Sequence, residues 1–253
     1  MGWLVEALSV GAIDRYDRQI RIAGWGRRGQ RKLARSSLLV AGVGGLGSCS
    51  AILLASAGIG RLRIVDGDVV ELTNLNRQTL HWERDVGVPK AESARAKLVA
   101  INSEVRMEAV QAEINEDSVN DLLRGMDGII DGLDNFETRY LLNRKAVERG
   151  IPFFHGSVYG LEGRATTVLA GRSPCLRCIY ESAPKPGIFP VAGPVPSLVG
   201  SVQALESIKY LLGLGEMLLG RMLVFDGQDL TFREIEIRRS PICPVCGKRR
   251  SSA

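Results

Sequence analysis

The stretch LLVAGVGGLGS (residues 38–48) decides the fold of this 253-residue chain. Residues 38–41 have the length and composition of a buried strand, and a glycine-rich turn follows them at once. Gly42, Gly44 and Gly47 complete the pattern G-x-G-x-x-G, in which missing side chains let backbone amides approach a phosphate. Because an apolar helical segment follows the turn, the stretch predicts a strand, a nucleotide-binding turn and a helix whose N-terminus faces the phosphate.

The alternation of strand and helix continues along the first half of the chain. Apolar runs of strand length alternate with segments of helical composition, which predicts a Rossmann-like, doubly wound α/β fold. Continuous apolar runs indicate a mostly parallel sheet that is covered on both faces. The predicted strands are residues 38–41, 62–65, 105–110 and 128–131, and the predicted helices are residues 46–57, 90–102, 116–124 and 137–149.

The second half of the chain has a different pattern. Its predicted strands, residues 152–159, 164–170, 222–225 and 230–237, are too closely spaced for crossover helices throughout, so we expect an antiparallel extension of the sheet. Residues 181–196 contain five prolines and are predicted to form an irregular loop over the site. Residues 198–212 return to helical periodicity.

Composition and charge limit the classes of protein. With 45% hydrophobic and 24% charged residues, the chain is an ordinary folded protein, and we expect a single domain over residues 1–253. A helical segment of about residues 1–35 would precede a nucleotide-binding half, about 36–160, and a second half, about 161–253. The net charge of +5 is spread along the chain except for Lys248 to Arg250, so no direct nucleic-acid binding is expected.

We expect a cytoplasmic protein without a membrane span. The N-terminus does not have the pattern of a secretory signal. Residues 36–60 carry no charge, but their many glycines suit a strand, turn and helix better than a lipid-facing helix. Five cysteines without an export signal indicate reduced thiols or metal ligands.

The residues after the glycine turn separate ATP from NAD. Asp66 ends the next strand, where an acid binds ribose hydroxyls in dinucleotide-binding folds, and this arrangement alone suits NAD. A triphosphate requires more positive charge, because its leaving group gains charge during the reaction. Two cations that can supply this charge follow in the sequence, Arg77 and Lys90, together with two amide side chains, Asn74 and Gln78. We predict ATP, and an NAD-dependent oxidoreductase remains the alternative.

Two acids follow the fourth predicted strand. Asp131 and Asp134 stand near the carboxyl edge of the sheet, where ligands gather in open α/β folds. A carboxylate at this edge can hold magnesium against phosphate oxygens. An aspartate here can equally cap the helix that starts near Phe136, so local sequence leaves both roles open.

Two C-x-x-C pairs predict a structural zinc site. Cys175 and Cys178 form one pair, and Cys243 and Cys246 form the other. Four thiolates at this spacing suit a closed tetrahedral zinc site, which would tie the C-terminal tail to the second half of the chain. A redox dithiol is the alternative, but neither pair stands early in a βαβ unit.

The remaining cysteine and the two histidines receive no catalytic role. Cys49 lies in the apolar helix after the turn and is interpreted as a small buried hydrophobe. His81 and His155 are too isolated in the sequence for a metal site or a catalytic triad.

Taken together, these motifs resemble the HesA/MoeB/ThiF family of ubiquitin-activating-type enzymes, from about residue 14 to residue 247. The resemblance rests on RYDRQ (15–19), GVGGLGS (42–48), DGD (66–68), NLNRQ (74–78), Lys90, DGLDN (131–135) and both C-x-x-C pairs. These motifs are specific in combination, and they occur in the order in which the family has them.

The resemblance implies an adenylyltransferase that uses ATP and Mg²⁺ and releases pyrophosphate. The implied substrate is the C-terminal glycine carboxylate of a ubiquitin-like sulfur carrier, used for molybdopterin, thiamine or tRNA thiolation. The implied cofactor-binding residues are Gly42, Gly44, Gly45, Gly47, Asp66, Asn74, Arg77, Gln78 and Lys90, and the implied catalytic residues are Arg18, Arg77, Lys90 and Asp134. Asp134 would position magnesium, and Arg18 would reach the neighbouring subunit of a homodimer.

One departure concerns a covalent intermediate. Family members that carry the acyl group onward generally place a cysteine in the crossover loop, and the sequence has no cysteine between Cys178 and Cys243. The resemblance therefore favours members that stop at the acyl-adenylate. Three alternatives remain open: adenylation of a small or tRNA-borne carboxylate, as in threonylcarbamoyladenosine dehydratases; the oxidoreductase; and a noncatalytic zinc-stabilised scaffold.

Overall fold

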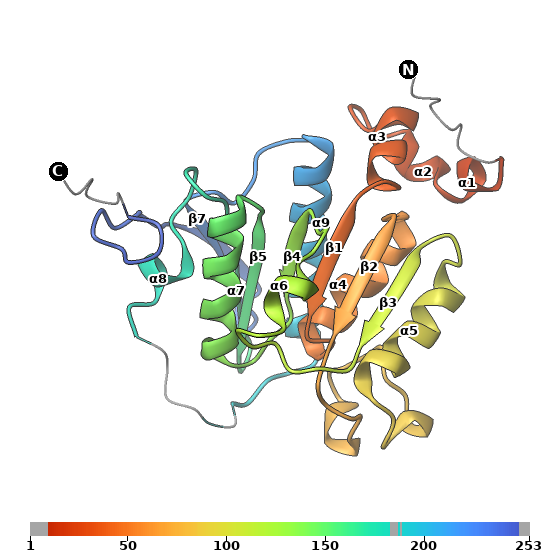
Figure 1. Cartoon of the computed structure of the whole chain (residues 1–253), viewed down its shortest axis with the longest axis horizontal. Helices are drawn as coiled ribbons and strands as arrows, with labels where there is room; N and C mark the ends of the chain where they lie inside the picture. The colour runs from red at the N-terminus through yellow and green to blue at the C-terminus, as the bar shows by residue number, and fades with distance from the viewer. Residues whose placement is uncertain (1–9, 183–186, 188, 248–253) are drawn as a thin grey trace.

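The computed structural model describes residues 10–182, 187 and 189–247 (Figure 1). Some predictions therefore concern residues outside this range, namely residues 1–9, Pro184 and Pro186, and Lys248 to Arg250. The elements are α1 (Val10–Arg15), α2 (Asp17–Ile20), α3 (Gly26–Leu33), β1 (Ser37–Ala41), α4 (Gly45–Ala57), β2 (Arg61–Val65), η1 (Leu72–Asn74), η2 (Glu83–Asp85), α5 (Lys90–Ile101), β3 (Arg106–Val110), α6 (Val119–Leu122), β4 (Gly128–Asp131), α7 (Phe136–Arg149), β5 (Phe153–Tyr159), β6 (Glu162–Val168), α8 (Leu176–Ile179), α9 (Pro194–Leu212), β7 (Arg221–Asp226) and β8 (Thr231–Glu236).

One mixed sheet runs through the described residues. Its eight strands have the order β3-β2-β1-β4-β5-β6-β7-β8. Strands β3 to β5 pair in parallel, while β6, β7 and β8 continue the sheet in antiparallel pairs. The predicted fold class, a doubly wound sheet with an antiparallel extension, is confirmed. The assignment of residues 1–253 to one domain stays a prediction, although the same sheet crosses both predicted halves.

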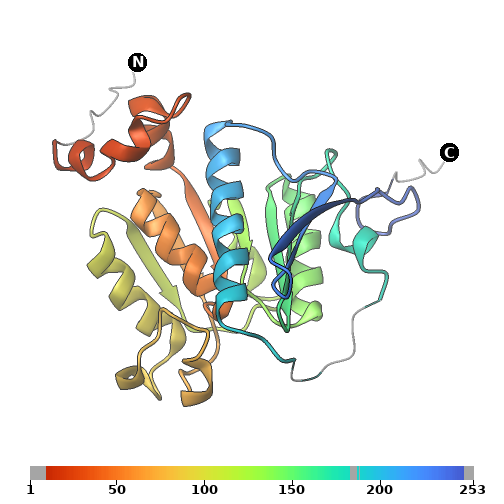
Figure 2. The same ribbon diagram turned by 180° about the vertical axis from the view of Figure 1, so that it is seen from behind.

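Helices cover both faces of the parallel strands (Figures 1 and 2). Alternate residues of β1 point to opposite faces, so Leu38 and Val40 pack in the core beneath α4, α5 and α9. Leu39 and Ala41 face the second core, beneath α6 and α7. Burial on both faces explains why the strand is apolar at every one of these positions.

The ends of several elements differ from the prediction. Helix α9 begins at Pro194, four residues before the predicted start, because proline suits the first turn of a helix, where its missing N–H has no helical partner. The predicted helix 116–124 shrinks to α6, and β6 begins at Glu162 rather than residue 164. The short helix α8, which contains Cys178, was not predicted.

Helices α1 to α3 lie at the amino end of the parallel strands, opposite the loops that follow the strands (Figure 1). Gln19 donates a hydrogen bond to the Ala57 carbonyl at the C-terminus of α4, and the ring of Tyr16 packs against Gly58. Helix α4 has 13 residues, so this contact lies about 20 Å from the glycine turn at the other end of the helix. Among the described helices, none is long and apolar enough to cross a membrane.

The sheet changes winding direction between β1 and β4. Strand β1 continues to β2 on one side, while β4 is its neighbour on the other side, which creates the crevice where open α/β folds bind ligands. Two glycines meet at this point: Gly42 has φ of +83°, and a Cβ atom on Gly132 would overlap the Gly42 carbonyl oxygen. The two backbones approach so closely because neither residue has a side chain.

We therefore expect Gly132→Ala to destabilise the chain. Overpacking against rigid backbone costs about 1–3 kcal/mol, which should lower the melting temperature by about 5 °C in a chain of this size. Gly11→Ala is the matched control, since a Cβ atom there meets none of the described residues within 4 Å and Gly11 lies in a helix. An unchanged melting temperature of Gly132→Ala in thermal unfolding would contradict the close approach.

Candidate active site

The glycines of the turn have different roles in the structure. A Cβ atom on Gly47 would overlap the Gly42 carbonyl, and one on Gly45 would lie 2.8 Å from Cβ of Pro196 in α9. These two glycines allow close packing of the turn with its neighbours. Gly44 is different, because a Cβ atom there would meet no atom closer than 3.6 Å. Gly44 is also partly exposed, so its backbone can be approached by a ligand.

The N-terminus of α4 lies at this open side. Gly44 is the N-cap residue and offers no side chain to cap the helix. Within the part of the chain that the structure describes, the amides of residues 44–47 take part in no recorded hydrogen bond. Exposed N–H groups and the positive end of the helix dipole together favour a phosphate.

Asp66 connects the end of β2 to the glycine turn. Its Oδ2 accepts a hydrogen bond from the Val43 amide at 2.8 Å, and its Oδ1 accepts one from the Asp68 amide at 2.9 Å. A carboxylate has about four lone-pair sites, so both oxygens retain capacity for a further donor such as a ribose hydroxyl. Asp66 thus orders the turn and stays available beside it.

Gln78 fits a ligand at the turn. Its side chain is buried, and Nε2 lies 3.6 Å from the position of a Cβ atom on Gly44. Its Oε1 is buried without a hydrogen-bond partner among the described residues. Buried polar atoms are rarely left unpaired, so this acceptor oxygen fits a donor group of a ligand, such as a hydroxyl. Asn74 is also buried, but its Oδ1 accepts from the Glu71 amide and supports the local chain.

The two predicted phosphate-binding cations lie in the segments beside the turn. Arg77 is half-buried and donates to the Thr73 carbonyl and to Oδ1 of Asn76, both at 3.0 Å. Its carbonyl oxygen lies 3.5 Å from the position of a Cβ atom on Gly45. Lys90 begins α5, is 6% exposed, and donates to Asp68 at 2.8 Å. The partners of both cations are exposed, so each cation can exchange its present partner for phosphate.

The two acids after β4 have separate roles. Asp131 is completely buried and contacts Arg139 at 3.1 Å and His155 at 2.6 Å. Burial raises the pKa of Asp131, but these two partners more than compensate and lower it overall. Asp131 is therefore a structural anion rather than a magnesium ligand.

Asp134 stays exposed at the carboxyl edge, two residues after Gly132 at the winding reversal. The cap of α7 is Asn135, whose side chain accepts from the Thr138 amide at 2.9 Å. The capping alternative for Asp134 is wrong, because its neighbour takes that place. Its carboxylate remains available to a cation.

His155 has a structural role that the sequence did not reveal. Burial lowers its pKa, so the imidazole is neutral, and its Nδ1–H donates to Asp131. Nε2 lies 3.4 Å from the Tyr180 hydroxyl, which links this cluster to the crossover segment. The partners are distant in the sequence, so no local pattern could have indicated them.

Arg18 lies apart from the other predicted residues. It is exposed in α2, whose neighbour Gln19 contacts the C-terminus of α4, about 20 Å from the turn. Within one chain, Arg18 therefore does not reach the glycine turn. Its predicted role requires a second copy of the chain.

The crossover segment reaches the site where it enters α9. Gly160, at the tip of the β5–β6 hairpin, exchanges backbone hydrogen bonds with Pro190 and Ala192, at 2.7 and 3.0 Å. A Cβ atom on Gly193 would overlap the Asn76 carbonyl. The described end of the proline-rich segment therefore lies between the hairpin tip and the segment that carries Arg77.

Four cysteines form a separate cluster. The sulfurs of Cys175, Cys178, Cys243 and Cys246 all lie within 4.8 Å of one another. The Sγ–Sγ distances are 3.6 Å for Cys175 and Cys243 and 3.4 Å for Cys178 and Cys246. Thiolates 2.3 Å from a tetrahedral ion are separated by about 3.8 Å, so the cluster fits a metal and is too open for a disulfide.

The comparison with known proteins identifies the family. The sequence profile of the ThiF family matches residues 16–245. This chain belongs to the ThiF family. The predicted resemblance is thereby confirmed.

Two relatives of this ThiF family member match over nearly their whole length. It is 44% identical over 248 residues to the "SAMP-activating enzyme E1" of Haloferax volcanii, covering 96% of this chain and 92% of the relative. It is 40% identical over 258 residues to the "Sulfur carrier protein adenylyltransferase" of Thermus thermophilus, covering 98% and 93%. The crystal structure of E. coli MccB with ATP superposes with a TM-score of 0.79 at 25% identity, covering 92% of this chain and 73% of MccB.

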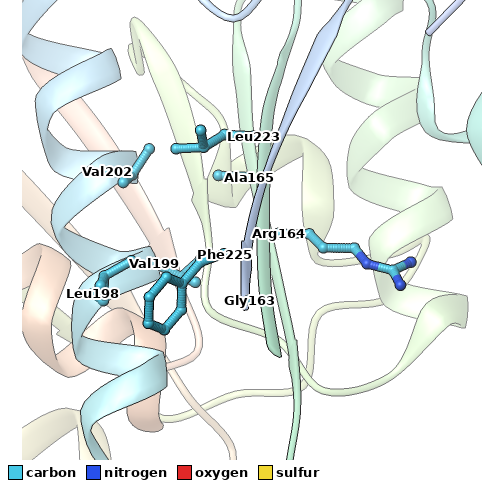
Figure 3. A pocket seen from close by; sticks show the side chains of 8 residues that line it. All are labelled: Gly163, Arg164, Ala165, Leu198, Val199, Val202, Leu223 and Phe225. Carbon is cyan, nitrogen blue, oxygen red and sulfur yellow. The ribbon is translucent and has the colours of Figure 1, made fainter. Parts of the chain in front are cut away.

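A small apolar groove in this ThiF family member is unsuited to a nucleotide. It lies between α9 and strands β6 and β7, with a cavity volume of about 10 Å³, about the space of one water molecule (Figure 3). Nucleotide-sized sites typically exceed about 300 Å³ and have polar groups aimed into them. Its wall residues are Leu198, Val199, Val202, Leu223 and Phe225, while the Arg164 side chain points away.

We expect Cys243→Ser to release a bound metal. Removing one of four thiolates opens a closed site, so metal content per chain should fall and the melting temperature should drop with it. Cys49→Ser is the matched control, since Cys49 lies on α4 and contacts the Ser197 carbonyl rather than the cluster. Elemental analysis of the purified proteins checks this, and a full metal content in Cys243→Ser would exclude the site.

Proposed function

We propose that this chain adenylates the C-terminal carboxylate of a ubiquitin-like sulfur-carrier protein, using ATP as the second substrate. One observation carries the proposal: the glycine turn, Asp66, Gln78, the segment of Arg77, Lys90 and Asp134 all lie at the carboxyl edge of one sheet. Two relatives of nearly the same length support it, because their names specify activation of SAMP and adenylylation of a sulfur carrier. The prediction of an adenylyltransferase agrees with both names.

The reaction requires positioning and charge neutralisation rather than a protein nucleophile. A carboxylate oxygen of the carrier attacks the α-phosphorus of ATP, the bond to the bridging oxygen breaks, and pyrophosphate leaves with the electron pair. The attacking carboxylate is already ionised at neutral pH, so no general base is needed. Arg77, Lys90 and the N-terminus of α4 would stabilise the charge that grows on the leaving group.

The site residues fit the two metal ions that we propose. Asp134 would hold Mg²⁺ against the phosphates, and this ion would neutralise charge on the leaving pyrophosphate. The four cysteines would hold Zn²⁺, the ion that four thiolates favour in closed structural sites. Zinc would join α8 to the C-terminal segment, as architecture for the second half of the chain.

We further propose a homodimer in which Arg18 acts on the partner's site. Its position beside the C-terminus of α4, far from the turn, motivates this proposal. The carrier would enter between the β5–β6 hairpin and the crossover segment, because both border the Arg77 segment. We keep a cytoplasmic location as a proposal, since four reduced thiols suit a reducing compartment.

Arg77→Ala and Asp134→Ala should each abolish most carrier-dependent exchange between ATP and pyrophosphate. Losing one well-placed charge costs on the order of 3 kcal/mol in the transition state, a rate loss of about a hundredfold. Both side chains lie outside the core, so we expect an unchanged melting temperature.

The exchange assay uses radiolabelled pyrophosphate with and without the carrier. Arg149→Ala is the matched control, because Arg149 contacts Asn120 at the end of α7, away from the carboxyl edge. Exchange at the wild-type rate in either variant would refute the assignments, while exchange without any carrier would point to a small carboxylate substrate.

A mixture of two inactive variants should recover activity if Arg18 acts between subunits. Arg18→Ala and Asp134→Ala are each expected to be inactive, yet a mixed dimer contains one site with both residues intact. Random reassortment by unfolding and refolding should restore about a quarter of the wild-type exchange rate. No recovery, together with proven subunit exchange, would place the action of Arg18 within one chain.

A further inference from the structure

A buried histidine contacts the back of the glycine turn. His81 is 3% exposed, and its Nε2 lies 2.9 Å from the carbonyl oxygen of Val43, inside the turn. Its Nδ1 lies 2.9 Å from Oγ of Ser93 in α5. His81 therefore bridges two elements that carry predicted phosphate-binding groups.

The neighbours of His81 determine the direction of each hydrogen bond. A carbonyl can only accept, so Nε2 carries the proton and donates to Val43. Lys97 can only donate, and its Nζ lies 2.7 Å from Ser93 Oγ, while the one Ser93 hydroxyl proton has two acceptors beside it, His81 Nδ1 and the Asp85 carboxylate. Lys97 also pairs with Asp85. A series of polar contacts therefore connects Asp85 and Lys97, through Ser93 and His81, to the Val43 carbonyl in the turn.

The hydrogen bonds and the surroundings of His81 both favour a neutral imidazole. Burial lowers the pKa of His81, and the nearby Lys97 and Lys90 lower it further, while the Val43 carbonyl and Asp66 act in the opposite direction. A neutral ring is what the hydrogen bonds require, because a protonated Nδ1 would place a second cation against the hydroxyl that Lys97 already contacts.

The peptide between Val43 and Gly44 is held from several sides. Its carbonyl accepts from His81 and from Ser48 Oγ at 3.0 Å, while the Val43 amide donates to Asp66. In a planar trans peptide the C=O and the following N–H point in opposite directions. Anchoring the carbonyl toward the core therefore aims the Gly44 N–H at the open side of the turn.

His81 also belongs to the segment that carries Arg77 and Gln78. Its amide donates to the Gln78 carbonyl at 3.0 Å, while its side chain contacts α5, which begins at Lys90. One buried side chain thus connects the glycine turn, the Arg77 segment and the Lys90 helix. A change at His81 would disturb their mutual position without touching the nucleotide.

We propose that His81 is a positioning residue that fixes the Val43–Gly44 peptide, so that the Gly44 amide is presented to the phosphates of ATP. This inference rests on the proposed function, because it assumes that ATP binds at the turn. His81 lies outside every motif found in the sequence. Its proposed role concerns binding of the nucleotide and not binding of the carrier.

The test measures the affinity for MgATP by calorimetry and the KM values for ATP and carrier. His81→Phe keeps the ring but removes both nitrogens, and we expect its Kd and KM for ATP to rise about tenfold, as expected for loss of one well-placed hydrogen bond. The kcat at saturating ATP and the KM for the carrier should change little. A role in stability alone would reduce the active fraction instead, and hence kcat.

The conservative variant His81→Gln tests whether the hydrogen-bond donor or the ring itself is required. The side-chain amide nitrogen of His81→Gln can take the place of Nε2, so its affinity for MgATP should lie within about threefold of the wild type. Ser48→Ala removes the second donor to Val43 with little change in volume, and we expect a smaller rise in Kd. Ser48→Ala also decides the question if His81→Phe does not fold.

Thr166→Val is the matched control for a lost buried hydrogen bond. The one hydroxyl proton of Thr166 lies between two acceptors, the Leu218 and Arg221 carbonyls, at 3.1 and 2.7 Å, in the antiparallel extension. Its melting temperature should fall while its affinity for MgATP stays at the wild-type value. This result would show that stability loss alone does not weaken nucleotide binding.

Three outcomes would overturn the inference. Wild-type affinity for MgATP in folded His81→Phe, or in Ser48→Ala if His81→Phe is unfolded, would remove the role of the Val43 carbonyl. A His81→Gln variant as weak as His81→Phe would remove the role of the donor. Absence of MgATP binding by the wild-type chain would instead refute the proposed function, and this inference with it.

Discussion

The site depends on the close approach of two backbone segments where β1 and β4 end. Gly42 and Gly132 meet there without side chains, and Gly47 allows the first turn of α4 to pack onto the same carbonyl. Because the backbones touch, the N-terminus of α4 opens directly at the point where the sheet reverses its winding. Every other proposed phosphate-binding group is positioned relative to this contact.

Buried polar groups hold this contact in place from two sides. On one side, Asp131 connects Arg139, His155 and the Leu133 amide, and so orders the backbone that leads to Asp134. On the other side, Asp66 and His81 hold the two polar groups of Val43. Such networks are worth most when every member has a partner, and these members do. Outside these networks, Arg77 is half-buried, Asp134 is exposed, and the buried Lys90 pairs with the exposed Asp68, so all three can respond to a ligand.

The two halves of the chain are joined by the sheet rather than by the site alone. Strands β4 and β5 pair in parallel, and β6 to β8 continue from them, so the strands that precede the two cysteine pairs, β6 and β8, belong to the same sheet as the candidate nucleotide site. Tyr180, two residues after Cys178, packs against Phe136 at the start of α7 with ring centroids 5.2 Å apart. A metal at the cysteines would therefore stabilise the segment that leads from the sheet into the crossover.

The sequence by itself determined the fold class and the family, and it predicted most residues of the candidate site, because those features depend on local patterns. Each of these patterns lies within a few residues: the apolar run 38–41 predicts a strand, the glycine spacing predicts a turn, and the two C-x-x-C pairs predict a metal site. The order of the motifs identifies the family. Only the tertiary structure assigned roles to Asp131, His81 and His155. Apart from the Leu133 amide, the partners of these side chains lie 8 to 38 residues away, as in the contacts of Asp131 with Arg139 and of His81 with Val43, and no periodic pattern encodes such contacts. The structure likewise decided that Asn135 caps α7 and that Arg18 lies a helix length from the turn, since both depend on how elements pack rather than on which residues they contain.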